Sequence, residues 1–171
     1  MPAPPNDPAE EIDYARAAPM ERELQLTIDS LPAMVVTYKP DGTCDFVNQT
    51  WRNYTGLTLK DTIGEGGTTH FNYFHPQDVE AAASAWRVSL ATGAPFAMEV
   101  RMRRSDGAYR WHSIRRTPLR NDAGDIVKWH GVGFDIEDRK SAEKALLRHE
   151  AYLAEAQKLS HTGSFGWSVS T

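Results

Sequence analysis

The chain has 171 residues and a net charge of −4, and 40% of its residues are hydrophobic. This length suits one folded domain with extensions, and the apolar content is sufficient for a core. The acidic balance excludes nucleic acid as the expected partner, because binding to phosphates calls for a basic face. The sequence contains no run of ~18 apolar residues that would predict a membrane span, and its single cysteine, Cys44, excludes an internal disulfide.

The N-terminal residues 1–19 are predicted to form a flexible lead-in, because they contain five prolines among small and acidic residues. They lack the basic and apolar regions of a signal peptide, so we expect a cytoplasmic protein. A helix is predicted from Met20 to Ser30, and the Leu31-Pro32 step ends it.

A β-hairpin and then short helices are predicted next. Residues 33–38 and 43–48 have the pattern of two strands, and Asp41-Gly42 lies in the turn that joins them. From Gln49 to Phe74 the chain is aromatic but interrupted by glycines, which indicates short helical pieces wrapped over a sheet.

The clearest helix of the first domain is predicted to begin at His75-Pro76. Proline suits the first helical position, and Asp78 places negative charge in the first turn. Gly93 supplies the expected end.

Three strands are predicted to follow. Apolar and polar residues alternate over residues 96–103, a turn at 105–107 leads into a strand over 109–119, and a turn at 121–124 leads into a strand over 126–136. Five antiparallel strands with helices collected on one face form an α+β domain. In the last strand, one face is predicted to carry Ile126, His130, Val132, Phe134 and Ile136, and the other Val127, Trp129, Gly131, Gly133 and Asp135.

The order of these elements resembles the PAS fold over roughly residues 24–140. The motifs that carry the resemblance are Val47-Asn48-Gln49, Tyr54-Thr55-Gly56, His75-Pro76-x-Asp78, Arg104-Ser105-Asp106-Gly107, Tyr109-Arg110-Trp111 and the closing Asp135-Ile136-Glu137, in which Glu137 replaces the usual Thr. The resemblance implies a PAS domain over residues 20–137 in a larger signalling protein. The expected parent is a two-component sensor histidine kinase. The alternatives are a ligand-free dimerisation module and the sensor part of a cyclic-dinucleotide signalling enzyme.

Residues 138–159 are predicted to form a signalling helix. Ala142, Leu146, His149, Leu153 and Ala156 follow a 4, 3, 4, 3 spacing, which is a heptad pattern. One interpretation is a coiled coil that joins a homodimer through Leu146, His149 and Leu153, and the resemblance supports it. The other is an amphipathic helix that docks on its own domain. We expect Asp135, Glu137 and Arg139 to couple the last strand to this helix.

Residues 160–171 resemble the opening of a second, truncated PAS repeat, with Ser160-His161-Thr162-Gly163 leading toward Trp167. We therefore expect the chain to be a piece of a longer protein that carries downstream kinase domains. An ordinary Gly-rich terminus is the alternative.

No catalytic residues are predicted in this chain. His149-Glu150 has the histidine and acid of an autokinase helix, but the following AYLAEAQ departs from the apolar-Arg-x-Pro continuation of that family. His161 is close to Gly163, which disfavours a helix interior. Neither a GxxxxGKS nucleotide loop nor a GxSxG nucleophile motif occurs in the sequence.

No metal or cofactor is predicted either. His112 and His130 lie on neighbouring predicted strands, but two imidazoles alone make a poor zinc site. Haem-binding PAS domains provide a histidine from the longer helix, whereas His75 lies only at its start. Flavin photosensors of the family carry a cysteine in a helical Asn-Cys-Arg run, whereas Cys44 lies on a strand.

A pocket between the sheet and the helices is the remaining candidate site, and a small organic ligand would suit its aromatic wall. Core packing explains the same residues equally well. Gly131 and Gly133 leave space for a ligand or for a closely packed helix. The candidate lining residues are Trp51, Tyr54, Phe71, Phe74, Trp86, Phe96 and Met98.

Overall fold

The structure is a computed structural model that describes residues 8–62 and 71–160, with the side chains of residues 19–62 and 71–158. It divides into two compact units, Met1–Asp135 and Ile136–Thr171. The segment expected to open a second repeat lies, from residue 161 onward, outside the described residues.

The first helix, α1 (Pro8–Ser30), is longer than the sequence predicts. It begins at Pro8 rather than at Met20, so residues 8–19 are helical where a flexible lead-in was predicted. Pro8 is the first helical residue, a position where the missing N–H removes no helical hydrogen bond. The residues between Pro8 and Pro19 are mostly good helix formers, and they outweigh the unfavourable Pro19 inside the helix.

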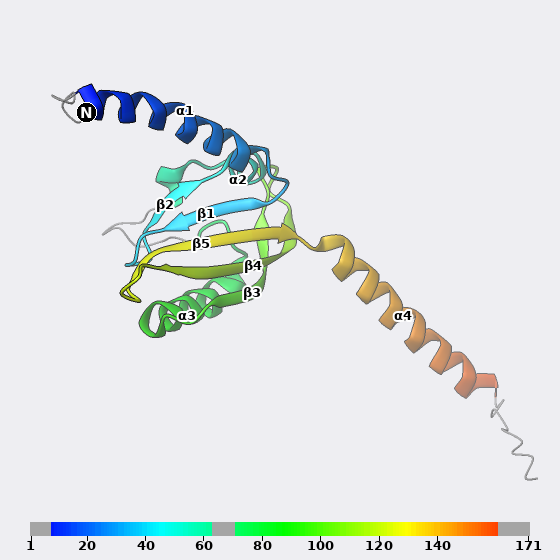
Figure 1. The fold of residues 1–171 in the computed structure, drawn as a ribbon. Helices are drawn as coiled ribbons and strands as arrows, with labels where there is room; N and C mark the ends of the chain where they lie inside the picture. Colours follow the sequence, from blue (N-terminus) through cyan, green and yellow to red (C-terminus); the bar gives the residue numbers. More distant parts are fainter. Residues whose placement is uncertain (1–7, 63–70, 161–171) are drawn as a thin grey trace, which may run out of the picture. The chain divides into compact units, whose positions relative to one another are not determined.

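The predicted five-stranded antiparallel sheet is confirmed, and its central strand is the last one in the sequence. The spatial order is β2-β1-β5-β4-β3 (Figure 1). β5 therefore has hydrogen-bonded neighbours on both sides. The last strand of the domain thus pairs with the first strand, β1, as well as with β4. The strands are β1 (Met34–Tyr38), β2 (Cys44–Val47), β3 (Phe96–Arg103), β4 (Tyr109–Arg120) and β5 (Ile126–Asp135).

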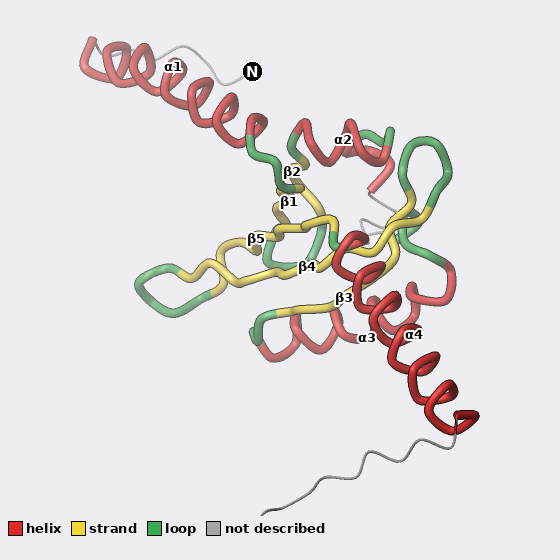
Figure 2. Tube along the Cα trace, turned by 90° about the vertical axis from the view of Figure 1, so that its right-hand side faces the viewer, coloured by secondary structure: helices red, strands yellow, loops and turns green. Residues whose placement is uncertain are grey.

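Helices cover one face of the sheet, as the α+β prediction requires (Figure 2). They are α2 (Gln49–Thr55), the 3₁₀ helix η1 (Leu59–Thr62) and α3 (Pro76–Thr92). The predicted limits of α3 are confirmed, because His75 caps its N-terminus and Gly93, at φ 69°, ends it in the left-handed conformation. Residues 63–70, between η1 and α3, lie outside the described residues.

The core lies between the sheet and these helices and is rich in aromatic rings. Trp86 of α3 contacts Tyr38 of β1, Phe96 of β3 and Trp129 of β5, with ring centroids 5.3, 5.9 and 5.0 Å apart. Trp51 of α2 is also buried. Large rings thus fill most of the space that the helices cover.

The two faces of β5 differ from what its apolar pattern suggests. The buried face carries Trp129, Gly131 and Gly133. Val132 and Phe134 lie on the opposite face and are 37% and 52% exposed. The glycine-bearing face is therefore the one that meets the core.

The second unit contains α4 (Glu137–Ser160). Glu137, which stands where the family usually has Thr, is its first residue, and with Asp138 it places negative charge in the first turn, which the helix dipole favours. No helix in the described parts of the chain has the length and apolar content needed to span a membrane.

Candidate functional site

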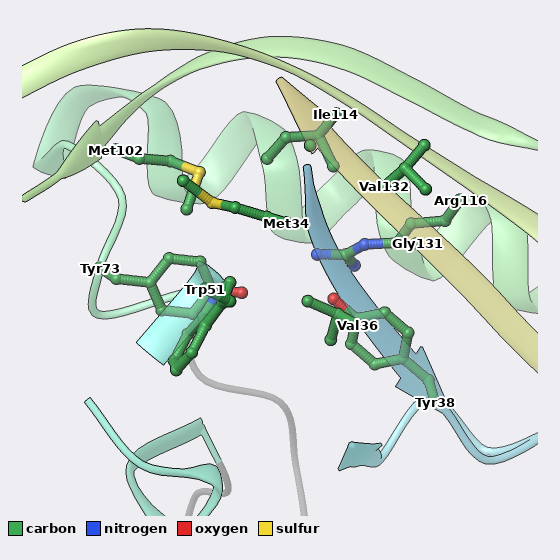
Figure 3. Close-up of a pocket in the computed structure, with 11 residues that line it drawn as sticks. Met34, Val36, Tyr38, Trp51, Tyr73, Met102, Ile114, Arg116, Gly131 and Val132 are labelled. Atoms are coloured by element: carbon green, nitrogen blue, oxygen red, sulfur yellow. The ribbon is translucent and has the colours of Figure 1, made fainter. Parts of the chain in front are cut away.

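A cavity of about 20 Å³ lies under the central strands, between the inner face of the sheet and α2 (Figure 3). This volume admits about one water-sized group. The walls are mostly apolar, and the polar atoms come from two tyrosines and one arginine. The lining residues are Met34, Val36, Tyr38, Trp51, Tyr73, Met102, Ile114, Arg116, Gly131, Val132 and Gly133.

The two glycines of β5 allow other groups to approach the strand. A Cβ atom on Gly131 would lie 3.3 Å from the Tyr38 ring, 3.3 Å from the carbonyl oxygen of Val36 and 3.4 Å from Cγ of Arg116. A Cβ atom on Gly133 would lie 3.6 Å from Cβ of Met34, an ordinary contact distance. Gly131 therefore makes room for the side chains of Tyr38 and Arg116.

Arg116 enters the cavity wall from β4 and is 1% exposed. In Figure 3 its guanidinium extends inward between Gly131 and Val36. Its Cζ atom lies 4.5 Å from the ring centroids of Tyr38 and Trp86, 4.9 Å from that of Phe96 and 5.3 Å from that of Phe71. These distances are those of cation–π contacts.

The cavity tyrosines are neutral hydroxyl groups. Burial raises the pKa of Tyr38 well above its ordinary value, and the charge of Arg116 opposes only part of this shift. Burial also raises the pKa of Tyr73, and the two hydroxyls hydrogen bond to each other. Each hydroxyl therefore keeps its proton near neutral pH.

Comparison with known families identifies this arrangement. The family model described as the PAS fold matches residues 45–133, which is just over half of the chain. The chain belongs to the PAS family.

Among curated relatives, the PAS chain is 33% identical to the peroxide stress-activated histidine kinase mak1 of Schizosaccharomyces pombe over 77% of its own length. It is 27% identical to the sensor protein FixL of Bradyrhizobium diazoefficiens over 66% of its length. The chain spans 8% of mak1 and 23% of FixL, so both relatives extend far beyond the matched segment.

Two solved structures show the same fold. An RNA-binding light-oxygen-voltage receptor superposes with a TM-score of 0.64 at 19% identity, over 88% of this chain and 41% of that one. A sensory box histidine kinase/response regulator from Burkholderia thailandensis superposes with a TM-score of 0.56 at 23% identity, over 78% of this chain and 98% of that one. At these identities the likeness concerns the fold alone.

The predicted pocket residues of the PAS domain do not all lie at the cavity. Trp51 lines the cavity. Phe71, Trp86 and Phe96 surround the guanidinium of Arg116, and Phe74 packs between Phe71 and Tyr73. Trp51 is thus the one predicted residue that lines the cavity itself.

Tyr54 and Met98 do not line this cavity. The Tyr54 ring packs against His112 with centroids 4.8 Å apart, and burial raises the pKa of its hydroxyl to about 12. Met98 of β3 is partly buried against the core.

Most of the cavity residues were not predicted from the sequence, and Arg116 and Tyr38 are the most important of them. A signal was present, because Arg116 follows His112 and Ile114 at two-residue spacing on the inward face of β4. A charged residue at an inward position is a strong indication of a polar site in a core.

The two strand histidines are not neighbours. His112 lies opposite Asp135 and is buried, whereas His130 lies opposite Thr117 and is exposed. The described residues contain no group of three or more His, Cys, Asp or Glu side chains placed to hold a metal ion. Cys44 is buried on β2, and burial raises the pKa of its thiol.

Asp135 and Arg139, two of the residues expected to couple the sheet to α4, each form an ion pair within their own unit. Asp135 binds Arg110 of β4, with 2.6 Å between Oδ2 and Nε. Arg139 forms an ion pair with Glu143 one turn further along α4. On α4 the side chains of Leu146, His149 and Leu153, predicted to form a dimer contact, are exposed in the single chain.

Proposed function

We propose that this PAS domain is the sensory module of a larger cytoplasmic signalling protein, in which a small ligand in the cavity changes the signal that α4 carries to an output domain. One observation carries the proposal. β5 lines the cavity with Gly131, Val132 and Gly133, and after the single residue Ile136 the same chain enters α4. A group larger than one water molecule must move the walls of the cavity, and β5 and its neighbouring strands carry most of these walls.

The proposed parent is a histidine kinase. The relatives mak1 and FixL are named as a histidine kinase and a sensor protein, and each is much longer than the segment matched here. Kinase activity would then belong to domains other than this one. The chain itself contributes sensing.

Dimerisation without a ligand is the second candidate function. The exposure of Leu146 and Leu153, seven residues apart on α4, supports it, because an apolar stripe at this spacing suits a coiled coil. Mass spectrometry of small molecules released by denaturing the purified chain separates the two functions. A stoichiometric compound supports sensing, and its absence from several preparations supports a dimerisation module.

The proposed coupling residue is Asp135. Its ion pair with Arg110 fixes the end of β5 to β4, immediately before the chain turns into α4. A shift of the last strands would therefore act on the first turn of α4 through Asp135, with Glu137 and Arg139 as the residues that receive it.

The test is Asp135→Ala in the full-length protein, with autophosphorylation measured in the presence and absence of a cell extract that changes the wild-type rate. We expect the variant to fold but to lose most of the response. Asp125→Ala, at the other end of β5, removes the same charge and should respond as the wild type does. A normal response of Asp135→Ala would contradict the proposed coupling.

A further inference from the structure

Arg116 places a permanent charge inside the sensory cavity. Among the described residues it is the only buried Lys, Arg, Asp or Glu side chain. A guanidinium stays protonated at every physiological pH, so the charge cannot be avoided by loss of a proton. A buried charge requires a partner that offsets the loss of water.

The described residues supply no such partner. Nε and Nη1 of Arg116 are buried and have no hydrogen-bond partner within that part of the chain. Tyr38 and Tyr73, the polar neighbours in the cavity wall, are neutral because burial raises the pKa of each hydroxyl. The cavity therefore has a net positive wall.

The aromatic rings around Arg116 satisfy only part of this need. They lie over the charge at cation–π distances, with Tyr38 and Trp86 at 4.5 Å. A ring that faces the guanidinium interacts with its charge, but the N–H groups still require oxygen acceptors in their own plane. Acceptors must come from another molecule or from residues outside the described ranges.

The other walls of the cavity indicate what kind of molecule could supply these acceptors. Met34, Val36, Met102 and Ile114 supply apolar walls of the cavity that the guanidinium enters (Figure 3). We infer that the cavity binds a small organic carboxylate, whose oxygens accept hydrogen bonds from Arg116 and whose short apolar part contacts Met34 and Met102. This inference rests on the proposed sensory function and names the class of its ligand.

The size of the cavity limits the ligand to a short chain. A volume of about 20 Å³ holds about one water-sized group, so even a short carboxylate must move its surroundings. The thioether side chains of Met34 and Met102 are the walls best able to move, because unbranched methionine repacks easily. An inorganic phosphate would leave these apolar walls without a partner.

The test titrates the 171-residue chain with butyrate, with the neutral butyramide and with inorganic phosphate, by calorimetry and by the midpoint of thermal unfolding. We expect butyrate to bind and to raise the midpoint. Butyramide should bind at least about tenfold more weakly, since it offers the guanidinium one acceptor oxygen instead of two and no negative charge. No binding of butyrate, or binding of phosphate alone, would overturn the inference.

Variants of Arg116 test whether the guanidinium is the group that binds butyrate. Arg116→Met should lose at least about tenfold in butyrate affinity. Arg115→Met, on the same strand but with an exposed side chain, is the matched control and should bind as the wild type does. Arg116→Lys keeps the charge without the planar fork, which provides a test if the Met variant fails to fold. Equal affinity of this variant for butyrate and butyramide would overturn the inference.

An internal partner for Arg116 is tested with Glu65, which belongs to residues 63–70 outside the described ranges. Glu65→Gln should leave the butyrate affinity unchanged. Strongly non-additive unfolding free energies of Glu65→Gln and Arg116→Met would reveal an ion pair between them and overturn the inference.

The inference and the proposed function can fail separately. A neutral compound released from the native chain would overturn the carboxylate and leave the sensory function standing. Gly133→Val narrows the cavity, and in the full-length protein it should abolish the response to the cell extract. If this variant responds normally and no compound is released, the sensory function itself fails.

Discussion

At the residue scale, the side chain of Asn48 joins three elements of the PAS domain. It is fully buried. Its Oδ1 accepts hydrogen bonds from the backbone N–H groups of Val35 and Trp51, at 3.0 and 3.1 Å. Its Nδ2 donates to the carbonyl oxygens of Ile28 and Ala33, at 3.1 and 2.9 Å. One amide thus connects the end of α1, β1 and the N-terminus of α2.

Asn48→Ala should therefore lower the free energy of unfolding by about 2–4 kcal/mol, because it leaves buried backbone groups without partners and removes the cap of α2. Asn48→Asp keeps the acceptor but loses both donated bonds, so we expect it to be destabilised as well. Urea unfolding measures both. Asn53→Ala, exposed on the same helix, should change the value by less than about 0.5 kcal/mol. A stable Asn48→Asp variant would show that the donated bonds contribute little.

A second residue-scale feature is the ion pair between Asp78 of α3 and Arg101 of β3. The Asp78 carboxylate accepts hydrogen bonds from Nε and Nη2 of Arg101, at 3.0 and 2.7 Å, and from its backbone N–H at 2.9 Å. The hydrogen bonds from the Arg101 side chain hold the pKa of Asp78 below its ordinary value. The Asp78 side chain is 14% exposed, so solvent screens the pair only partly.

The stability that Asp78 contributes is present above the ordinary Asp pKa of about 4 and is lost as the pH falls through its lower folded value. Asp78→Asn should therefore be less stable than the wild type at pH 7, and the difference should shrink below about pH 4. Urea unfolding between pH 7 and pH 3 measures this. Asp122→Asn, in an exposed turn, controls for the change in net charge. A difference that stays constant with pH would mean that the charge of Asp78 is not its source.

At the scale of elements, β5 determines where the cavity lies. It is the central strand, and its buried face has no side chain at Gly131 or Gly133. Large groups from the neighbouring strands, Tyr38 and Arg116, occupy the space over Gly131. The space over Gly133 is only loosely filled, by Met34. The cavity therefore follows from the glycines of one strand.

Alanine at the two positions should have different effects. Gly133→Ala meets only ordinary contacts and reduces the entropy of the unfolded chain, so we expect a gain of about 0.4–1 kcal/mol. Gly131→Ala must push against the Tyr38 ring and the Val36 carbonyl, which costs about 1–3 kcal/mol and cancels that gain. Chemical unfolding of both variants compares them directly, since they lie two residues apart on one strand. Equal stabilities would contradict the proposed close contact at Gly131.

At the scale of the whole molecule, the chain consists of a folded sensor unit and a helical unit with an exposed apolar stripe. Leu146 and Leu153 are 60% and 49% exposed in the single chain. Burial of such an apolar stripe lowers the free energy of the protein, and a second copy of α4 in parallel would bury it. Dimerisation through α4 is therefore the expectation for the intact protein.

The double variant Leu146→Lys with Leu153→Lys should convert a dimer to a monomer in analytical ultracentrifugation, because it places like charges in the stripe. Thermal unfolding of the sensor unit should stay within a few degrees of the wild type. Leu147→Lys is the matched control, since Leu147 is 66% exposed but lies off the stripe. A dimer that survives the double variant would place the contact on another surface, such as the outer face of the sheet with Phe134.

Local patterns were sufficient to predict most elements, because each depends on neighbours in the sequence. The alternation over residues 96–103, the Asp41-Gly42 turn, and the His75-Pro76 start and Gly93 end of α3 are short-range signals, and the structure confirms them. The predicted start of the first helix at Met20 was wrong. The prolines before it were interpreted as a sign of a flexible segment, whereas Pro8 occupies the first position of α1.

The sequence by itself determined the order of elements, the α+β class and the resemblance to PAS domains. Only the tertiary structure decided that β5 lies between β1 and β4, because strand order depends on contacts between distant residues. It also decided which face of β5 meets the core, since both faces carry apolar side chains. The cavity and the buried guanidinium of Arg116 followed from that choice, because they need Gly131, Tyr38 and Trp86 from three different elements.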